Sequence, residues 1–91
     1  MIAQIPQVGQ IYYHYKHLTE SKLDAVYEIM GIGGNANNDQ YDQKWVVYKP
    51  LQSTYHLTQF EITCYIRPLA EFLETVTING QEIPRFSIKI N

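Results

Sequence analysis

The chain has 91 residues, of which 45% are hydrophobic and 18% are charged, and its formal net charge is −2. This length predicts one domain with a single core over residues 1–91, and the composition is typical of a globular chain rather than a disordered one. The seven basic residues are scattered, which argues against nucleic acid as a partner. The first residues do not resemble a secretory signal and no apolar run has the length of a membrane span, so we expect a cytoplasmic protein without a membrane partner.

Three segments of the first half are predicted to be β-strands, because they are rich in tyrosine and β-branched residues. They are residues 10–15, 25–32 and 44–49. The third segment is apolar on both faces and is therefore expected at the centre of a sheet, ending at Pro50 because proline cannot continue a ladder. Residues 19–22 indicate a loop or a single helical turn.

Residues 31–43 are rich in glycine and asparagine, so they are expected to form the longest loop. Their glycines lack the closing lysine of a phosphate-binding loop and the spacing of a dinucleotide fingerprint. Asp39 and Asp42 lack the alternating acids of a calcium loop. The sequence therefore predicts neither a cofactor nor a metal.

Residues 60–66 show the clearest alternation in the chain. Apolar side chains recur at every second position, namely Phe60, Ile62, Cys64 and Ile66. This pattern predicts a strand with those four side chains buried. Cys64 is then a small core residue and not a reactive thiol, since a reactive thiol needs exposure and a cationic neighbour.

A short helix is predicted after Pro68, because proline is favoured in the first helical turn and the apolar residues Leu69, Phe72 and Leu73 follow helical spacing. Asn79-Gly80 then predicts a tight hairpin between residues 75–78 and 81–83.

Two details of this hairpin region define its geometry. A two-residue turn places Val76 opposite Ile83, which gathers the apolar side chains on one face. The apolar positions shift from odd to even numbers after Pro84, so we expect a bulge or bend at Pro84-Arg85, where the strand passes to another sheet.

Together these elements predict a mainly β domain. We expect a small, SH3-like, partly open barrel of five to seven short strands with one short helix after Pro68. A flat sheet with a helix on one face is the alternative. The eight tyrosines suit such half-buried strand faces, since the ring packs while the hydroxyl stays in water.

Several short motifs occur in an order that resembles a known family. They are Tyr12-x-His14-Tyr15-Lys16, Tyr27-Glu28-x-x-Gly31, Val46-Val47-Tyr48-Lys49-Pro50-Leu51, Ile66-Arg67-Pro68-Leu69-x-x-Phe72 and Asn79-Gly80-x-x-Ile83-Pro84-Arg85-Phe86. From about residue 8 to residue 86 the chain resembles a small bacterial family, domain of unknown function 1653 (DUF1653). The resemblance implies no activity, cofactor or catalytic residue.

The chain also departs from the family pattern. Family members usually carry a His-Ser/Thr-Glu-Thr segment where this chain has residues 33–38, so a histidine and a glutamate are absent. The first loop, residues 17–24, is enlarged, and Gly9 lies one residue farther from His14 than usual. If the family shares a ligand site that uses that segment, the resemblance implies that this chain has lost it or changed its specificity.

The candidate ligand-binding residues are Tyr12, His14, Lys16, Tyr65, Arg67 and Arg85. Alternation projects the first three to one side, and it places Tyr65 with Arg67 on one face. If these faces adjoin, they form a cationic, aromatic-lined patch for a carboxylate, a phosphate or a peptide. The structural alternative, which we favour, is that both arginines pair with Glu74, Glu82 or backbone carbonyls.

Three classes of function follow from these residues. A binding or adaptor module for a small anion or a peptide is preferred, as a monomer or a homodimer, because a domain of this size has little room for enclosed chemistry. A small enzyme would need His14 beside a carboxylate such as Glu61 or Glu74. A nucleic-acid binder would use the tyrosines to stack bases, but the acidic balance disfavours it.

Overall fold

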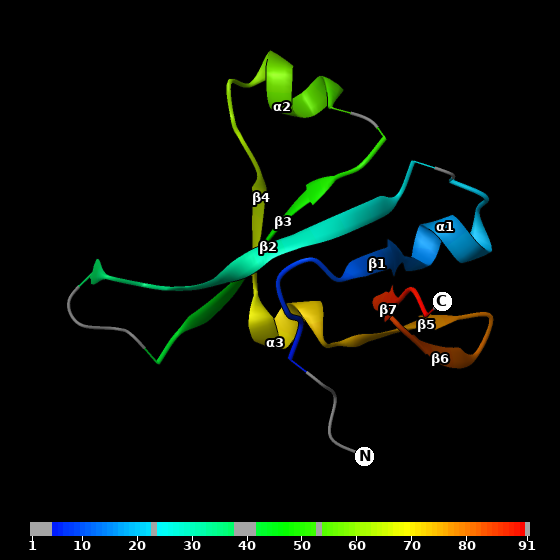
Figure 1. The fold of residues 1–91 in the computed structure, drawn as a ribbon. Helices are drawn as coiled ribbons and strands as arrows, with labels where there is room; N and C mark the ends of the chain where they lie inside the picture. Colours follow the sequence, from blue (N-terminus) through cyan, green and yellow to red (C-terminus); the bar gives the residue numbers. More distant parts are fainter. Residues whose placement is uncertain (1–4, 23, 38–41, 53, 91) are drawn as a thin grey trace.

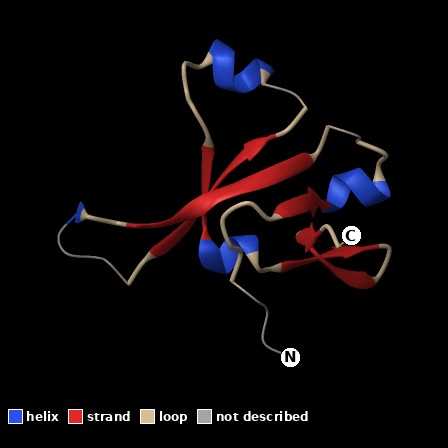
Figure 2. Ribbon diagram, in the orientation of Figure 1, coloured by secondary structure: helices blue, strands red, loops and turns tan. Residues whose placement is uncertain are grey.

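The computed structural model of the chain describes residues 5–22, 24–37, 42–52 and 54–90. In this part of the chain, seven strands form two antiparallel sheets, and three short helices lie in the connections between strands (Figure 2). The elements are β1 (Ile11–His14), α1 (Tyr15–Thr19), β2 (Val26–Gly34), β3 (Lys44–Pro50), α2 (Tyr55–Gln59), β4 (Tyr65–Pro68), α3 (Leu69–Phe72), β5 (Thr75–Ile78), β6 (Gln81–Pro84) and β7 (Phe86–Ile88).

The larger sheet has the strand order β4-β3-β2-β1-β7 and does not close on itself, while β5 and β6 form a separate hairpin (Figure 1). The prediction of a mainly β, partly open fold is confirmed. The single predicted helix is present as α3, but α1 and α2 were not predicted. Each has only five residues, too few for a helical hydrophobic pattern to become visible in a sequence.

The long hairpin of β2 and β3 forms the centre of the sheet, as the sequence predicted for residues 44–49. Tyr27 pairs with Pro50 at one end and Gly34 with Lys44 at the other, with a bulge between Ile29 and Gly31. The expected loop over residues 31–43 is therefore wrong in its first part, because β2 continues through Gly34. Asp39 lies outside the described residues.

The predicted buried strand over residues 60–66 is wrong. Phe60 ends helix α2, Glu61 has a positive φ of 57°, and strand pairing begins only at Tyr65. Phe60, Ile62 and Ile66 are exposed at 64%, 41% and 62%. The alternation also has the opposite sense in β4, where Tyr65 and Arg67 face the interior and Ile66 faces outward.

Helix α3 and the following hairpin lie where the sequence predicted them. In the hairpin, Val76 pairs with Ile83 and Ile78 with Gln81. Asn79 and Gly80 have φ values of 52° and 80°, the two positive angles that a type I′ turn requires. The turn therefore depends on Gly80 directly.

Substitution of Gly80 by valine is expected to lower the free energy of unfolding by about 1–3 kcal/mol, because a β-branched residue resists a positive φ. Gly31→Val is the matched control, since Gly31 lies in strand β2 with no positive φ and no atom within 4 Å of an added Cβ. Chemical denaturation of both variants measures the difference. Equal stability of the two variants would contradict the turn assignment.

The predicted change of sheet after Pro84 is confirmed. Strand β6 pairs with β5, and after the single residue Arg85 strand β7 pairs with β1 of the other sheet. The backbone of Arg85 joins the two: its N–H donates to Glu74 O at 2.9 Å and its carbonyl accepts from Tyr15 N at 2.8 Å.

The hydrophobic core lies on the inner face of the larger sheet, beneath α3. Its buried members are Tyr12, Ile29, Val46, Tyr48, Phe72 and Phe86. The Phe72 ring, from α3, stacks on Phe86 with the ring centroids 4.1 Å apart. Beyond this stack, toward α1 and α2, the inner face is open and forms a pocket.

Candidate functional site

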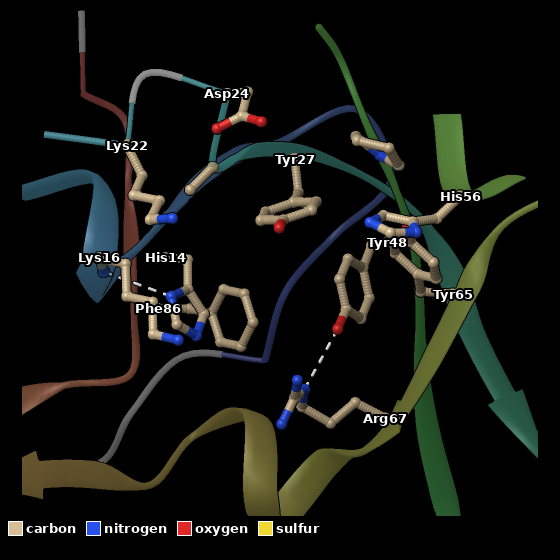
Figure 3. Close-up of a pocket in the computed structure, with 12 residues that line it drawn as sticks. His14, Lys16, Lys22, Asp24, Tyr27, Tyr48, His56, Tyr65, Arg67 and Phe86 are labelled. Atoms are coloured by element: carbon tan, nitrogen blue, oxygen red, sulfur yellow. Dashed lines mark hydrogen bonds between the residues drawn. The ribbon is translucent and has the colours of Figure 1, made fainter. Parts of the chain in front are cut away.

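A pocket of about 430 Å³ occupies the open end of the inner face, between α1, the sheet and α2 (Figure 3). Most of the side chains that line it are charged or carry a ring. Its lining consists of His14, Lys16, Lys22, Asp24, Ala25, Tyr27, Tyr48, Pro50, His56, Tyr65, Arg67 and Phe86. The sheet supplies the rings, while the loop after α1 and helix α2 supply residues at the rim.

Three tyrosines form one wall of the pocket. Tyr27, Tyr48 and Tyr65 come from three neighbouring strands and touch edge to face, with ring centroids 5.3–6.5 Å apart. Because the rings contact one another, they leave no space for a cation between them, unlike an aromatic cage for a quaternary ammonium. Burial raises the pKa of Tyr27, so its phenol stays neutral. The wall offers an apolar surface made of ring faces and edges.

Arg67 is a cation held in a fixed position. Its Nε donates a hydrogen bond to the Tyr48 hydroxyl at 3.1 Å, and its Nη1 donates to Glu71 at 2.6 Å (Figure 3 shows the first). The guanidinium carbon also lies 5.5 Å from the centroid of the Phe86 ring. Burial favours loss of the proton, but these two partners outweigh it and raise the pKa of Arg67. Part of its donor capacity remains for a ligand.

The ring of His14 packs edge to face with the ring of Phe86, and the two ring centroids are 5.1 Å apart. Its Nδ1 accepts a hydrogen bond from the backbone N–H of Lys16 at 3.3 Å, which caps helix α1. Burial, and after it the nearby positive charges of Arg67, Lys16 and Arg85, lower the pKa of His14 to about 4. At neutral pH the ring is therefore uncharged.

Lys16 and Lys22 place two more cations at the rim. Neither ammonium forms an ion pair with another described residue, so both charges are available to a ligand. Asp24 is the one carboxylate of the lining. The pocket thus carries three cationic groups against one anionic group, although the formal charge of the whole chain is −2.

Comparison with known proteins places this sequence in a family. The family described as "Protein of unknown function (DUF1653)" matches residues 10–88. The chain belongs to this family. No curated protein matches the chain, and no solved structure matches it.

Two of the three departures from the family pattern that the resemblance implies lie in different places of this DUF1653 chain. Residues 33–37, where the family usually has its His-Ser/Thr-Glu-Thr segment, lie at the end of the β2–β3 hairpin and do not line the pocket. Asn38 is outside the described residues. The loop after α1, which the resemblance implies is enlarged, supplies Lys22 and Asp24 to the pocket.

Four of the six candidate residues from the sequence meet in the pocket: His14, Lys16, Tyr65 and Arg67. The other two do not line it. Tyr12 is on the same face of β1 as His14, but Phe72 covers it and it is only 6% exposed.

Arg85 takes the structural role that the sequence suggested, since its guanidinium lies 3.5 Å from Glu74. Its Nε is buried and has no hydrogen-bond partner within the described chain.

Several lining residues were missed by sequence reasoning. Tyr27 and Tyr48 had a detectable signal, because they sit on the strand faces that adjoin His14 and Tyr65. Lys22, Asp24 and His56 had none, since they reach the pocket from irregular or unpredicted segments.

The geometry of an enzyme that pairs His14 with Glu61 or Glu74 is not present. Neither glutamate lines the pocket, and Glu74 lies against Arg85. Within residues 5–22, 24–37, 42–52 and 54–90, no three His, Cys, Asp or Glu side chains gather as a metal site. In the same ranges, no helix has the length and apolar character needed to cross a membrane.

Proposed function

We propose that this chain is a small cytoplasmic binding module whose pocket takes a small ligand with an anionic group and a flat apolar part. The observation that carries the proposal is the meeting of three cations, Lys16, Lys22 and Arg67, with a wall of tyrosine rings in one cavity. The cations of the cavity fix an anionic group by charge and hydrogen bonds, while the rings remove a flat group from water.

The size and composition of the pocket support a small ligand. Its volume of about 430 Å³ falls in the range of sites that hold small molecules. Such sites combine apolar walls with a few polar groups that fix the orientation of the ligand. The Arg67 guanidinium meets this description, because Tyr48 and Glu71 hold it in place before any ligand arrives.

A thermal-shift screen tests the proposal. Phenyl phosphate and benzoate are expected to raise the melting temperature of the chain, since a ligand that binds only the folded state stabilises it. Phenol and benzyl alcohol carry the ring without the charge and are expected to have little effect. A short single-stranded oligonucleotide and an acidic peptide complete the panel.

The variant that decides the assignment is Lys16→Gln combined with Lys22→Gln, which removes two charges from the rim without removing an ion pair within the described chain. It is expected to lose most of the shift caused by phenyl phosphate. Lys44→Gln, on an exposed residue of β3 outside this pocket, is the control and is expected to keep the full shift. An undiminished shift in the double variant, or a shift with the oligonucleotide alone, would contradict the proposal.

A further inference from the structure

The ring of His14 both caps helix α1 and lines the pocket. Its Nδ1 accepts the N–H of Lys16 and caps α1, so the neutral ring carries its proton on Nε2. The same ring lines the pocket beside Lys16 and Phe86 (Figure 3). The Nε2–H donor that faces the pocket and the Nδ1 acceptor that caps α1 thus belong to the same ring.

The groups around this ring are mainly cationic. Burial, together with the charges of Arg67, Lys16 and Arg85, keeps a proton off the ring, and Glu20 acts in the other direction. The remaining titratable side chains of the pocket are those of Lys22, Asp24, Tyr27, Tyr48, His56 and Tyr65. Within the described chain, no carboxylate is hydrogen-bonded to His14. An anion that enters the pocket therefore supplies the negative charge that this ring lacks.

We propose that, in the anion-binding role put forward above, the pocket takes a doubly charged oxyanion of the phosphate or sulfate type, and that His14 takes up one proton as this oxyanion binds. The bound oxyanion offsets the charges of Arg67 and Lys16, so the charged ring becomes favourable where the empty pocket opposes it. The proton comes from solvent, and no bond of the ligand changes.

The double charge follows from the groups that remain unpaired. Arg67 is partly neutralised by Glu71, which leaves Lys16 and Lys22 as the two cations of the pocket lining that form no ion pair with a described residue. A dianion balances both. A tetrahedral oxyanion also has enough oxygens to accept from the His14 ring, Arg67 and the two ammonium groups together, whereas a carboxylate has two.

Proton uptake has a structural consequence for α1. A protonated imidazole donates from both nitrogens, so Nδ1 then ceases to accept the N–H of Lys16. Binding is thus expected to release the cap of α1 and to change the environment of the Lys16 amide. A neutral His14 that only donates from Nε2 would leave that amide bonded.

A titration with sodium sulfate, followed by NMR of the histidine ring nitrogens and the backbone amides, tests the proposal. Sulfate keeps both of its charges near pH 5.5 and near pH 7.5, so only the protein titrates. Because the pKa of His14 is about 4 in the empty pocket, affinity rises as the pH falls through the higher pKa of the bound state. If bound sulfate restores an ordinary pKa of about 6.5, the affinity is about tenfold higher near pH 5.5 than near pH 7.5.

Two variants assign the effect to one ring. His14→Asn keeps a side-chain oxygen that can cap α1 but removes the imidazole, so it is expected to fold and to lose the pH dependence attributed to His14. His56→Gln removes the other imidazole of the pocket and is expected to retain that dependence. The assignment to His14 would be overturned if His56→Gln lost the pH dependence of sulfate affinity and His14→Asn retained it.

The remaining outcomes separate this inference from the proposed function. Sulfate that binds equally at both pH values, with the ring of His14 neutral and the Lys16 amide unchanged, overturns the proton uptake and leaves anion binding in place. Benzoate that binds while sulfate does not overturns the oxyanion class alone. Failure of every anion of the panel to bind removes the proposed function itself.

Discussion

Replacing Phe72 by alanine is expected to lower the free energy of unfolding by about 3–5 kcal/mol, the cost of removing a large ring from a packed core. Phe72 is only 1% exposed. It stacks on Phe86 and meets Tyr12 and Tyr48 edge to face, with ring centroids 5.3 and 5.8 Å away. Chemical denaturation gives the stability directly.

The same substitution is expected to weaken binding in the pocket, because Phe86 loses the ring beneath it while it contacts His14 and Arg67 on the pocket side. If the alanine variant does not fold, Phe72→Leu keeps most of the volume and gives a smaller loss of the same sign.

Phe60→Ala is the control for this loss. Phe60 is 64% exposed, so its replacement is expected to change stability by no more than about 0.5 kcal/mol. Similar losses for the two phenylalanines would contradict the assignment of the core.

Arg67→Lys is expected to reduce stability and anion binding together. Lysine keeps the charge but not the planar group that reaches Tyr48 and Glu71 at once, so the free energy of unfolding falls by about 1–3 kcal/mol. The affinity for phenyl phosphate is expected to fall by about tenfold, since a fixed guanidinium binds a phosphate through two directed hydrogen bonds. Calorimetric unfolding and a phenyl phosphate titration of the same sample measure both.

Two further variants separate the two roles of Arg67. Glu71→Gln removes the partly exposed partner and is expected to cost no more than about 1 kcal/mol, while anion affinity rises because a competing negative charge is gone. Arg85→Lys changes an arginine outside the pocket and is expected to leave anion affinity unchanged. A loss of stability in Arg67→Lys with no change in binding would assign Arg67 to structure alone.

The parts of the fold that sequence predicts well are those determined by neighbouring residues. The hairpin around Asn79-Gly80 follows from turn geometry within a few residues, and its register was correct in every pair. The central position of β3 follows from the apolar residues on both of its faces. The change of sheet at Arg85 follows from the shift in apolar positions after Pro84.

The error at residues 60–66 shows what alternation alone does not determine. Residues 60–64 form no strand, and within β4 the alternation does not state which of the two faces is interior. In β4 the interior face holds Tyr65 and Arg67, because the neighbouring Tyr48 accepts the hydrogen bond of Arg67. Because polar side chains point into the pocket here, the polar face of the strand is the interior one. Only knowledge of the pocket would predict this reversal.

The sequence predicts the part of the candidate site that lies on the strands. His14 with Tyr65 and Arg67 could be brought together from strand faces, and Lys16 follows two residues after His14. Tyr12 was misplaced because strand parity does not show where α3 covers the sheet. His56 and Lys22 depend on the tertiary path of α2 and of the loop after α1, which short irregular segments do not encode locally.

The backbone of Arg85 gives the molecule a mechanical property. One peptide unit on each side of this residue is bonded to a different part of the fold, Glu74 before the hairpin and Tyr15 at the start of α1. Opening of the hairpin base therefore displaces Arg85, whose carbonyl accepts the hydrogen bond that positions Tyr15 and the lysine next to it. We expect the amides of Tyr15 and Arg85 to exchange with deuterium at similar rates, as members of one cooperative unit that transmits motion of the hairpin to the mouth of the cavity.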